Sequence, residues 1–317
     1  MTETLSRSDM TIRTLRESDL PAADHILRSA FNTFVGVPDL FGDTNYVRTR
    51  WLADPDAALA AELDGRLVGS NFVTRWGTVG FFGPLSVPPE LWDRGIASQL
   101  MEATIDVFDR WGTSHAGLFT FAHSPKHHGL YQKFGFWPRY LTPIMVHPVS
   151  PKPRSARTTY YTELSASDRE RAVHSCKELT DTAYDGLDLT REIRALEAQG
   201  LGEVVLIDDE TGVVGMAICH LGAGSEAGSG RCYVKFGLAL PGTDAPSRFN
   251  ALLDACESLA AERGAAEVEL GVNAGRHEAY AAVAGRGYRA TLVGVSMHRP
   301  NDGGYSHPGV WLIDDWR

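Results

Sequence analysis

Apolar residues alternate with polar ones in some segments of the first half of the chain and recur at helical spacing in others. Asp64-Gly65 is typical of a two-residue hairpin turn, so we expect antiparallel strands on either side of it. Pro88-Pro89 cannot donate ladder hydrogen bonds and is expected to end the strand before it. The pattern predicts, in chain order, a strand at 11–15, helices at 20–31 and 45–52, strands at 57–62, 66–74 and 79–87, a helix at 96–111, a strand at 117–122, a helix at 125–133, and a closing strand at 140–147 that completes the unit.

The second half repeats this order after a basic, proline-rich segment at 150–157, which we interpret as a linker between two domains. Residues 222–230 are rich in glycine and are predicted to form a flexible loop. The apolar and aromatic residues 310–316 are expected to dock on a sheet or domain face. The repeat is predicted as strands at 158–164, 203–209, 213–220, 233–240, 266–272 and 288–298, with helices at 167–179, 248–263 and 276–284.

These elements predict an α/β (α+β) protein of two tandem domains, residues 1–149 and 158–317. Each domain is expected to contain a mixed, mostly antiparallel sheet flanked by helices. With 317 residues, 43% of them hydrophobic and 22% charged, the chain is long enough for about two globular cores.

Charge and cysteine usage narrow the functional classes. The formal net charge of −10 has the wrong sign for non-specific binding to nucleic acid or to an anionic membrane. No segment has the apolar length of a membrane span, and the N-terminus lacks the apolar core of a signal peptide. The four cysteines show no CxxC spacing and lie in apolar segments, so we expect a cytoplasmic protein with reduced, structural thiols.

The segment from Gly83 to Met101 is the first candidate for a binding site. An apolar strand ends at Pro88-Pro89, and Arg94-Gly95-Ile96-Ala97 then opens a helix. A helix start has free backbone N–H groups, and small residues allow close approach, so this turn is suited to a phosphate or pyrophosphate. A plain strand-to-helix turn that contains a glycine remains the alternative.

Two short motifs in this order of elements resemble the GNAT N-acetyltransferase family. Leu85-Ser86-Val87 followed by Arg94-Gly95-Ile96-Ala97 is similar to the family's acetyl-CoA pyrophosphate loop. Leu130-Tyr131-Gln132-Lys133-Phe134-Gly135-Phe136 is similar to its LY-x-x-x-GF helix end. The resemblance covers residues 11–148 and implies an acetyl-CoA-dependent N-acetyltransferase, in which an amine attacks the thioester directly.

The resemblance also assigns roles to particular residues. The turn is expected to bind the pyrophosphate, the backbone of Leu85 and Val87 to pair with the pantetheine amides, and an N–H near Val87 to polarise the thioester carbonyl. Tyr131 is the expected acid for the leaving thiolate, and His123 is the candidate base, with a structural histidine as the alternative. The expected cofactor-binding residues are Leu85, Ser86, Val87, Arg94, Gly95, Ile96, Ala97, Ser98 and Ser124.

The histidines near this site are not interpreted as a metal centre. His127 and His128 belong to a helix start that is expected to be exposed, and no fixed carboxylate or cysteine lies near them in sequence. Ser124 stands where the family often has asparagine.

Trp92 departs from the family pattern, because this position commonly holds glutamine or arginine. Tryptophan at this position weakens the predicted contact with the cofactor, but the positive charge of Arg94 can replace the missing one.

The second copy lacks the binding turn. Its loop after Pro241 has no Gly-x-Gly or Gly-x-Ala at the helix start, and Asp244 would repel a pyrophosphate. Asn273 and Tyr280 keep the seven-residue spacing of the family's second motif. We therefore interpret the second domain as a degenerate copy that packs on the first, shapes the acceptor cleft or dimerises.

Three functions are compatible with the sequence. The first is an N-acetyltransferase with a small-molecule or peptide amine as acceptor. The second is a non-catalytic acyl-CoA or small-molecule binding protein, and the third is an acyl transfer of the tandem mycothiol synthase type. The sequence indicates no nucleic-acid or membrane partner, leaves a homodimer open, and does not identify the amine.

Overall fold

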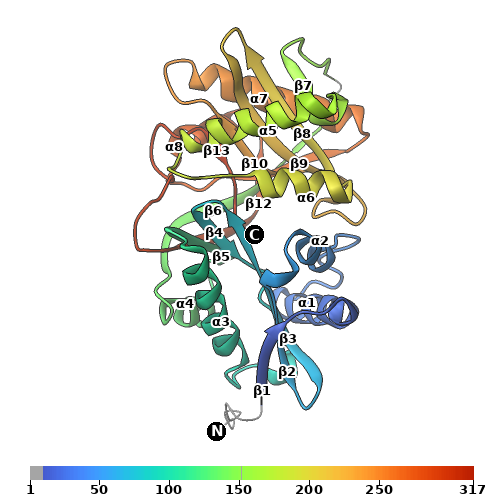
Figure 1. The fold of residues 1–317 in the computed structure, drawn as a ribbon, viewed down its shortest axis with the longest axis vertical. Helices are drawn as coiled ribbons and strands as arrows, with labels where there is room; N and C mark the ends of the chain where they lie inside the picture. The colour runs from blue at the N-terminus through green and yellow to red at the C-terminus, as the bar shows by residue number, and fades with distance from the viewer. Residues whose placement is uncertain (1–9, 151) are drawn as a thin grey trace.

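The computed structural model describes residues 10–150 and 152–317, and these residues share one 13-stranded sheet (Figure 1). The strands of the first half are β1 (Met10–Thr14), β2 (Ala58–Leu63), β3 (Arg66–Trp76), β4 (Val79–Phe82), β5 (His115–Phe121) and β6 (Trp137–Pro148). Its α-helices are α1 (Leu20–Val35), α2 (Tyr46–Ala53), α3 (Ile96–Trp111) and α4 (Pro125–Gln132).

Local sequence signals explain several of these boundaries. Helix α1 has Pro21 in its first turn and ends at Gly36, whose φ of 75° is in the left-handed region that favours glycine. Asp64 and Gly65 both have positive φ and join β2 to β3, which confirms the predicted hairpin. One side of α1 is buried, as its apolar spacing predicts, through Leu20, Ala23, Ile26, Leu27 and Ala30.

The second half contains the same series of elements. Its strands are β7 (Thr158–Tyr160), β8 (Gly202–Asp209), β9 (Gly212–Gly222), β10 (Gly228–Ala239), β11 (Glu267–Gly271), β12 (Arg289–Arg299) and β13 (Leu312–Ile313). Its α-helices are α5 (Ala166–Asp181), α6 (Thr190–Gln199), α7 (Ala245–Glu262) and α8 (His277–Gly285). The predicted α/β architecture of two related halves, with mostly antiparallel strands flanked by helices, is confirmed, and the strands of both halves lie in one sheet.

The two halves exchange a strand at the centre of the sheet. The strand order is β1-β2-β3-β4-β5-β12-β6-β11-β10-β9-β8-β7, with β13 beside β10. Strand β12 of the second half lies between β5 and β6, and β6 of the first half lies between β12 and β11. The expectation that residues 140–147 close the first unit by themselves was therefore wrong, because the edge of β5 pairs with the second half.

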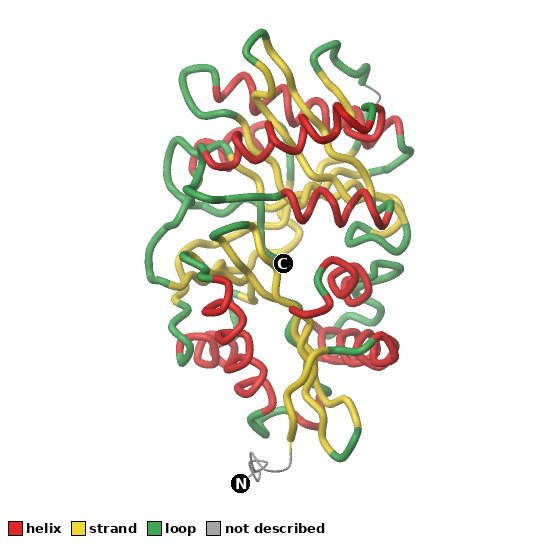
Figure 2. Tube along the Cα trace, viewed as in Figure 1, coloured by secondary structure: helices red, strands yellow, loops and turns green. Residues whose placement is uncertain are grey.

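Four clusters of buried side chains hold the helices on the sheet. In the first half, one cluster lies beneath α3 and the other beneath α1 and α2, on opposite sides of the strands (Figure 2). The clusters of the second half include α7 and α8 in one and α5 and α6 in the other. Trp76, Val79 and Phe81 of the first half belong to the α5–α6 cluster, so the hydrophobic core continues across the junction.

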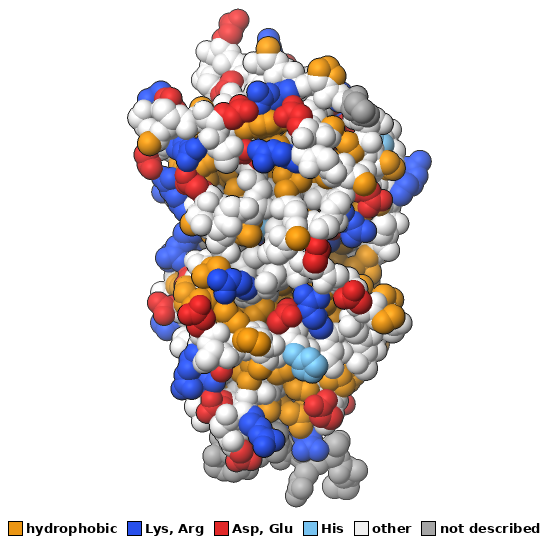
Figure 3. Space-filling model, turned by 90° about the vertical axis from the view of Figure 1, so that its right-hand side faces the viewer, with side chains coloured by type: hydrophobic (Ala, Val, Ile, Leu, Met, Phe, Trp, Pro, Cys, Tyr) orange, Lys and Arg blue, Asp and Glu red, His pale blue; other side chains and the backbone are white. Residues whose placement is uncertain are grey.

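The surface shows no extended area of one charge on the face drawn in Figure 3. Positive and negative side chains are interspersed there with apolar ones. This face therefore lacks the one-sign field that attracts a polyanion.

Strand β4 ends earlier than the sequence pattern indicates. A continuous strand was predicted over 79–87, but regular pairing stops at Phe82, and only Ser86 pairs again, in an isolated bridge with Ser70. The chain turns at Gly83, which has a φ of 143°, so the break comes before Pro88-Pro89. The residues between Phe82 and Pro88 therefore form an edge that does not pair with β5.

Candidate active site

The start of α3 presents unpaired backbone N–H groups, and we call this turn the nest. Gly95 precedes the helix with a φ of 87°, and its carbonyl accepts hydrogen bonds from Ser98 N (3.1 Å) and Gln99 N (3.2 Å). Within residues 10–150 and 152–317, no group accepts a hydrogen bond from the N–H groups of Gly95, Ile96 or Ala97. Free N–H groups at a helix start, together with the helix dipole, suit an anion.

Two basic residues, Arg94 and Lys126, lie near this nest. The guanidinium of Arg94 is half-buried and has no hydrogen bond or ion pair with any residue that the structure describes. Lys126 at the start of α4 pairs with Asp93 (2.8 Å), and its Nζ lies 5.3 Å from the centre of the Trp92 ring. Arg94 is therefore available for a phosphate, whereas Lys126 is partly neutralised.

An unpaired backbone edge leads away from the nest. Strands β4 and β5 run parallel and pair as far as Phe81 and Gly117, after which β4 leaves β5. Ser86 then bonds on its other side to Ser70, with N–O distances of 2.9 and 3.0 Å. The N–H groups of Leu85 and Val87 have no acceptor among the described residues, which leaves them free for an extended ligand with amide groups.

Trp92 occupies one group on this edge. Its indole N–H donates to the carbonyl of Val87 at 2.8 Å. The departure from the family pattern thus has a structural role, because the indole holds the turn against the end of the edge. The Val87 carbonyl retains one lone pair and the Val87 N–H remains free.

Tyr131 lies in α4 behind this edge and is almost fully buried. Its ring packs against Phe82 (5.7 Å between centroids) and lies 6.4 Å from the ring of His127. Burial raises the pKa of Tyr131 well above its ordinary value, so the phenol keeps its proton at neutral pH. No described residue forms a hydrogen bond with its hydroxyl.

The structure brings His123 and His127 together around Phe34. His123 is exposed and stacks on Phe34 with 6.0 Å between ring centroids, and His127 lies 4.8 Å from the same ring. The expectation of an exposed helix start was wrong for His127, which is half-buried with its Nδ1 unpaired. Desolvation and the charge of Lys126 lower the pKa of His127 to about 4, so its imidazole is neutral at pH 7.

The sequence missed His127 because its position at the start of α4 indicated exposure. Phe34, at the end of α1, covers it from the other side. Its spacing of four residues from Tyr131 was a usable signal, since residues four apart share one helix face. His127 therefore joins His123 and Tyr131 as a candidate site residue.

Ser124 acts as a helix cap. Its hydroxyl accepts a hydrogen bond from the N–H of His127 at the start of α4 (3.4 Å). This contact fixes the helix that carries both His127 and Tyr131. The described residues contain no group of three or more His, Cys, Asp or Glu side chains that could hold a metal ion.

The corresponding edge in the second half is filled by the protein itself. Strand β10 pairs in parallel with β11 as far as Val234 and Leu270, as β4 pairs with β5. Strand β13 then lies along Gly237 and Leu238, and Ala239 N donates to Trp311 O at 3.0 Å. The residues 310–317, which we call the closing segment, thus occupy the space that stays open beside Leu85 and Val87. Their docking confirms the prediction for this apolar stretch.

Counted from the helix N-cap, no tyrosine in the described second half takes the place of Tyr131, although Asn273 and Tyr280 keep the family's spacing. Tyr131 is the seventh residue after the N-cap Ser124, and the seventh after the N-cap Arg276 of α8 is Val283. Asp244 is the N-cap of α7, so a carboxylate stands where the first half has Gly95. These features leave the site of the first half without an equivalent in the second.

Comparison with known proteins agrees with this geometry. Residues 21–136 match the family model described as "Acetyltransferase (GNAT) family". This match covers most of the first half of the chain. No curated protein sequence matches the chain.

Several solved structures share the fold over nearly the whole chain. A Pyrococcus horikoshii protein, named as a presumed acetyltransferase, has a TM-score of 0.70 at 18% identity, over 100% of this chain and 98% of that one. A GCN5-related N-acetyltransferase from Sphaerobacter thermophilus has a TM-score of 0.61 at 17% identity, over 93% and 96% of the two chains. A tandem GNAT protein from the clavulanic acid biosynthesis pathway has a TM-score of 0.56 at 12% identity, over 91% and 98%. At these identities the likeness shows the fold, here a tandem GNAT arrangement.

None of the helices in the described part of the chain has the length and apolar character needed to cross a membrane.

Proposed function

We propose that this protein is an acetyl-CoA-dependent N-acetyltransferase whose first domain carries the reaction. The observation that supports this most directly is the unpaired backbone at the GNAT loop. The N–H groups of Gly95–Ala97 and the guanidinium of Arg94 suit a pyrophosphate, and the N–H groups of Leu85 and Val87 suit the amides of a pantetheine arm. The four cysteines are free and buried, which agrees with the reducing cytosol where we place the protein.

The reaction is a direct transfer between two bound substrates. The amine nitrogen attacks the thioester carbonyl carbon, and a backbone N–H near Val87 stabilises the negative charge that develops on the oxygen. The carbon–sulfur bond then breaks, and the departing thiolate takes the proton of Tyr131. The proton released by the amine passes to His123, directly or through water, and neutral His127 is a second acceptor close by.

Two measurements test this proposal. Thermal unfolding with and without acetyl-CoA reports cofactor binding, and thiol release with a panel of amines reports transfer. We expect acetyl-CoA to raise the unfolding temperature and at least one amine to release free CoA thiol. A chain that shows neither effect would refute the proposal.

A second candidate is a non-catalytic acyl-CoA binding protein. The hydrogen bond from Trp92 to the Val87 carbonyl favours it, because this carbonyl is then only partly available to the pantetheine arm. Binding of acetyl-CoA without thiol release for any amine in the panel would support this candidate over the enzyme.

A further inference from the structure

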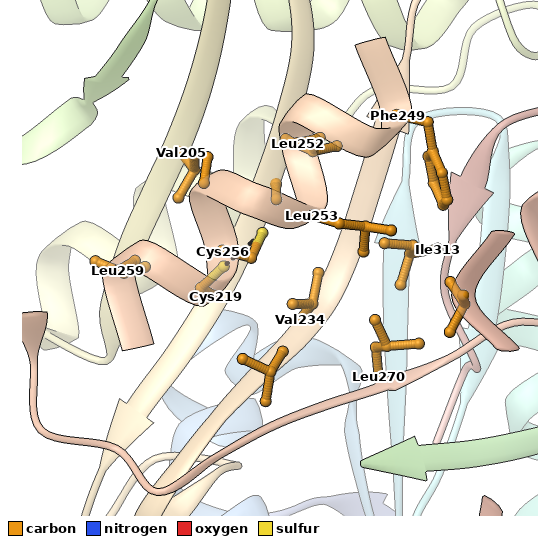
Figure 4. Close-up of a cluster of buried hydrophobic side chains, with 14 of the residues drawn as sticks. Val205, Cys219, Val234, Phe249, Leu252, Leu253, Cys256, Leu259, Leu270 and Ile313 are labelled. Atoms are coloured by element: carbon orange, nitrogen blue, oxygen red, sulfur yellow. Dashed lines mark hydrogen bonds between the residues drawn. The ribbon is translucent and has the colours of Figure 1, made fainter. Parts of the chain in front are cut away.

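The closing segment continues from the second domain into the first. Ile313 packs among Leu253, Leu270 and Phe249 in the core between β10 and α7 (Figure 4). Asp314 is fixed by Arg276, which donates to its side chain at 2.6 Å and to its carbonyl at 3.0 Å. The segment is therefore anchored in the second domain before it reaches the junction.

Its last residues contact two elements of the first domain. A Cβ on Gly117 of β5 would lie 2.0 Å from the Trp316 ring, so the indole rests directly on this strand. The indole N–H donates to the Tyr305 hydroxyl at 2.9 Å. The main-chain oxygen of Arg317 then accepts a hydrogen bond from Arg50 of α2. In Figure 1 the marked C-terminus accordingly lies between the two halves.

Arg50 is a buried arginine whose hydrogen bonds reach three residues at the junction: Glu226, Gly83 and Arg317. Its Nε and Nη2 donate to the two carboxylate oxygens of Glu226 at 3.0 and 3.1 Å. Its Nη1 donates to the carbonyl of Gly83. Arg50 is only 5% exposed, so these contacts determine its position.

Glu226 belongs to the glycine-rich stretch that was predicted to be a flexible loop, yet it is buried and tightly held. Lys235 lies 3.0 Å from it and also pairs with Glu192 at 2.8 Å. Burial alone would raise the pKa of Glu226, but the charges of Arg50 and Lys235 outweigh this effect and keep the carboxylate ionised. The second domain thus presents a fixed negative charge to Arg50.

Gly83 is the residue at which β4 turns away from the sheet. Its N–H donates to Phe72 O at 2.8 Å, and its carbonyl is held by Arg50. The free N–H groups of Leu85 and Val87 follow directly after this turn. The orientation of these groups therefore depends on where Arg50 holds Gly83.

We propose that Arg50 is a positioning residue for acyl transfer, and that Glu226 and the closing segment hold it in place from the second domain. This inference rests on the proposed function of the first domain. It gives the degenerate copy a role in catalysis without a cofactor of its own. The arginine does not touch the reacting atoms and acts through the backbone of Gly83–Val87.

The test compares two interdomain arginines in the full-length chain. Arg50→Lys keeps the charge opposite Glu226 but removes the planar fork that reaches three residues at once. Arg191→Lys is the matched control, because Arg191 of α6 also crosses the junction, to Asp54 (2.6 Å), but is largely exposed and does not contact Gly83. Both variants are assayed for acetyl-CoA affinity, kcat and KM.

We expect Arg50→Lys to lower kcat by about 10- to 100-fold, the loss typical of a small misplacement of reacting groups. Its acetyl-CoA affinity should fall by less than about tenfold, or about 1.4 kcal/mol, because Leu85 and Val87 lose alignment with the pantetheine amides but the nest at α3 is untouched. Arg191→Lys should leave kcat unchanged. An unchanged kcat in Arg50→Lys, or an equal loss in both variants, would overturn the proposal.

Hydrogen exchange provides a readout that does not depend on activity. The amides of Gly83 and Ser86 are hydrogen-bonded, to Phe72 O and Ser70 O, and should exchange faster in Arg50→Lys but not in Arg191→Lys. If exchange is faster in Arg50→Lys but the unmodified protein transfers no acetyl group, Arg50 still positions Gly83. The proposed function would then be refuted instead. If Arg50→Lys fails to fold, Glu226→Gln is measured in its place and should show the same exchange, and unchanged exchange there would overturn the inference.

Discussion

Tyr131 combines burial with a free hydroxyl, and this combination makes its role testable. We expect Tyr131→Phe to lower kcat by about 100-fold, because general acid catalysis typically contributes at least that factor. Its free energy of unfolding should change by less than about 1 kcal/mol, since no described residue bonds to the hydroxyl. Steady-state thiol release from pH 7 to 10 measures the first effect and urea unfolding the second.

The control for this variant is Tyr280→Phe, on α8 of the second domain. Tyr280 lies in the second half, where β13 occupies the strand edge that stays open in the first half. Its variant should therefore keep full turnover. Turnover of Tyr131→Phe equal to that of the unmodified protein across the alkaline range would show that another group protonates the thiolate.

Two buried histidines at the junction predict a loss of stability in mild acid. His115 of β5 and His298 of β12 share a hydrogen bond (3.0 Å). Desolvation, followed by the charge of His115, lowers the pKa of His298 to about 2. As the pH falls, His298 is protonated in the unfolded state before it is protonated in the folded state. Its contribution to the free energy of unfolding is therefore full above pH 6.5 and is lost as the pH falls below that value.

At pH 5 this loss amounts to about 2 kcal/mol for His298 relative to pH 8. Urea unfolding at the two pH values measures it. In His298→Gln the difference between the two free energies should shrink by about that amount, whereas His174→Gln, on the surface of α5, should leave it unchanged. An identical pH dependence in His298→Gln and the unmodified protein would contradict the assignment.

Sequence reasoning predicted the elements that follow local rules. The helix starts at Gly95 and Ser124 both depend on short segments, and short segments determine their own backbone. Ser124, predicted to bind the cofactor, caps α4 in the structure. His127 was misjudged because a residue from α1, Phe34, covers it. Arg50 was not identified at all, because its partners Glu226 and Arg317 lie far from it in the chain.

At the scale of elements, the start of α3 makes a prediction about cofactor affinity. Gly95→Ala should weaken acetyl-CoA binding by roughly tenfold, because the left-handed conformation costs a residue with a Cβ about 1–2 kcal/mol and the N–H groups of the nest would shift to relieve it. Isothermal titration with acetyl-CoA measures the change.

The other end of the same helix supplies the control. Gly112 also has a positive φ, of 62°, and a Cβ there would contact nothing within 4 Å. Gly112→Ala should therefore lose comparable stability but keep its affinity for acetyl-CoA. Equal affinities in the two variants would mean that the start of α3 is not the pyrophosphate site.

The lengths of the elements were easier to predict than the way they pair. Helices α1 and α3 and the β2–β3 hairpin follow from apolar spacing and turn residues. The end of β4 was misplaced because Pro88-Pro89 is a strong signal, whereas the break at Gly83 depends on contacts with β3 and α2. Alternating apolar and polar residues in β6 and β12 predict that these segments are strands. They do not specify which strands lie beside them, since every strand edge offers the same backbone donors and acceptors.

At the scale of the whole molecule, the exchanged strands join the two domains into one sheet. Strand β6 pairs with β11 and β12 of the second domain, and β12 pairs with β5 of the first. Removing either domain would leave the strand edge of β5 or β11 without a partner, and such edges promote aggregation. The buried cluster that includes Trp76 and Phe236 would be opened at the same time.

This continuity predicts a single cooperative unfolding transition, although the chain carries two copies of one fold. Urea unfolding followed by tryptophan fluorescence and by far-UV circular dichroism should give coincident curves, because neither domain keeps its sheet when the other unfolds.

A protease site inserted at residues 152–157 should leave the cleaved halves associated and still able to bind acetyl-CoA, since the exchanged strands hold them together without the linker. Residues 1–150 produced alone should instead aggregate, because β6 and the edge of β5 would both lack partners. Two separate transitions, or a soluble and folded first half, would show that the exchange is not needed for the stability of either domain.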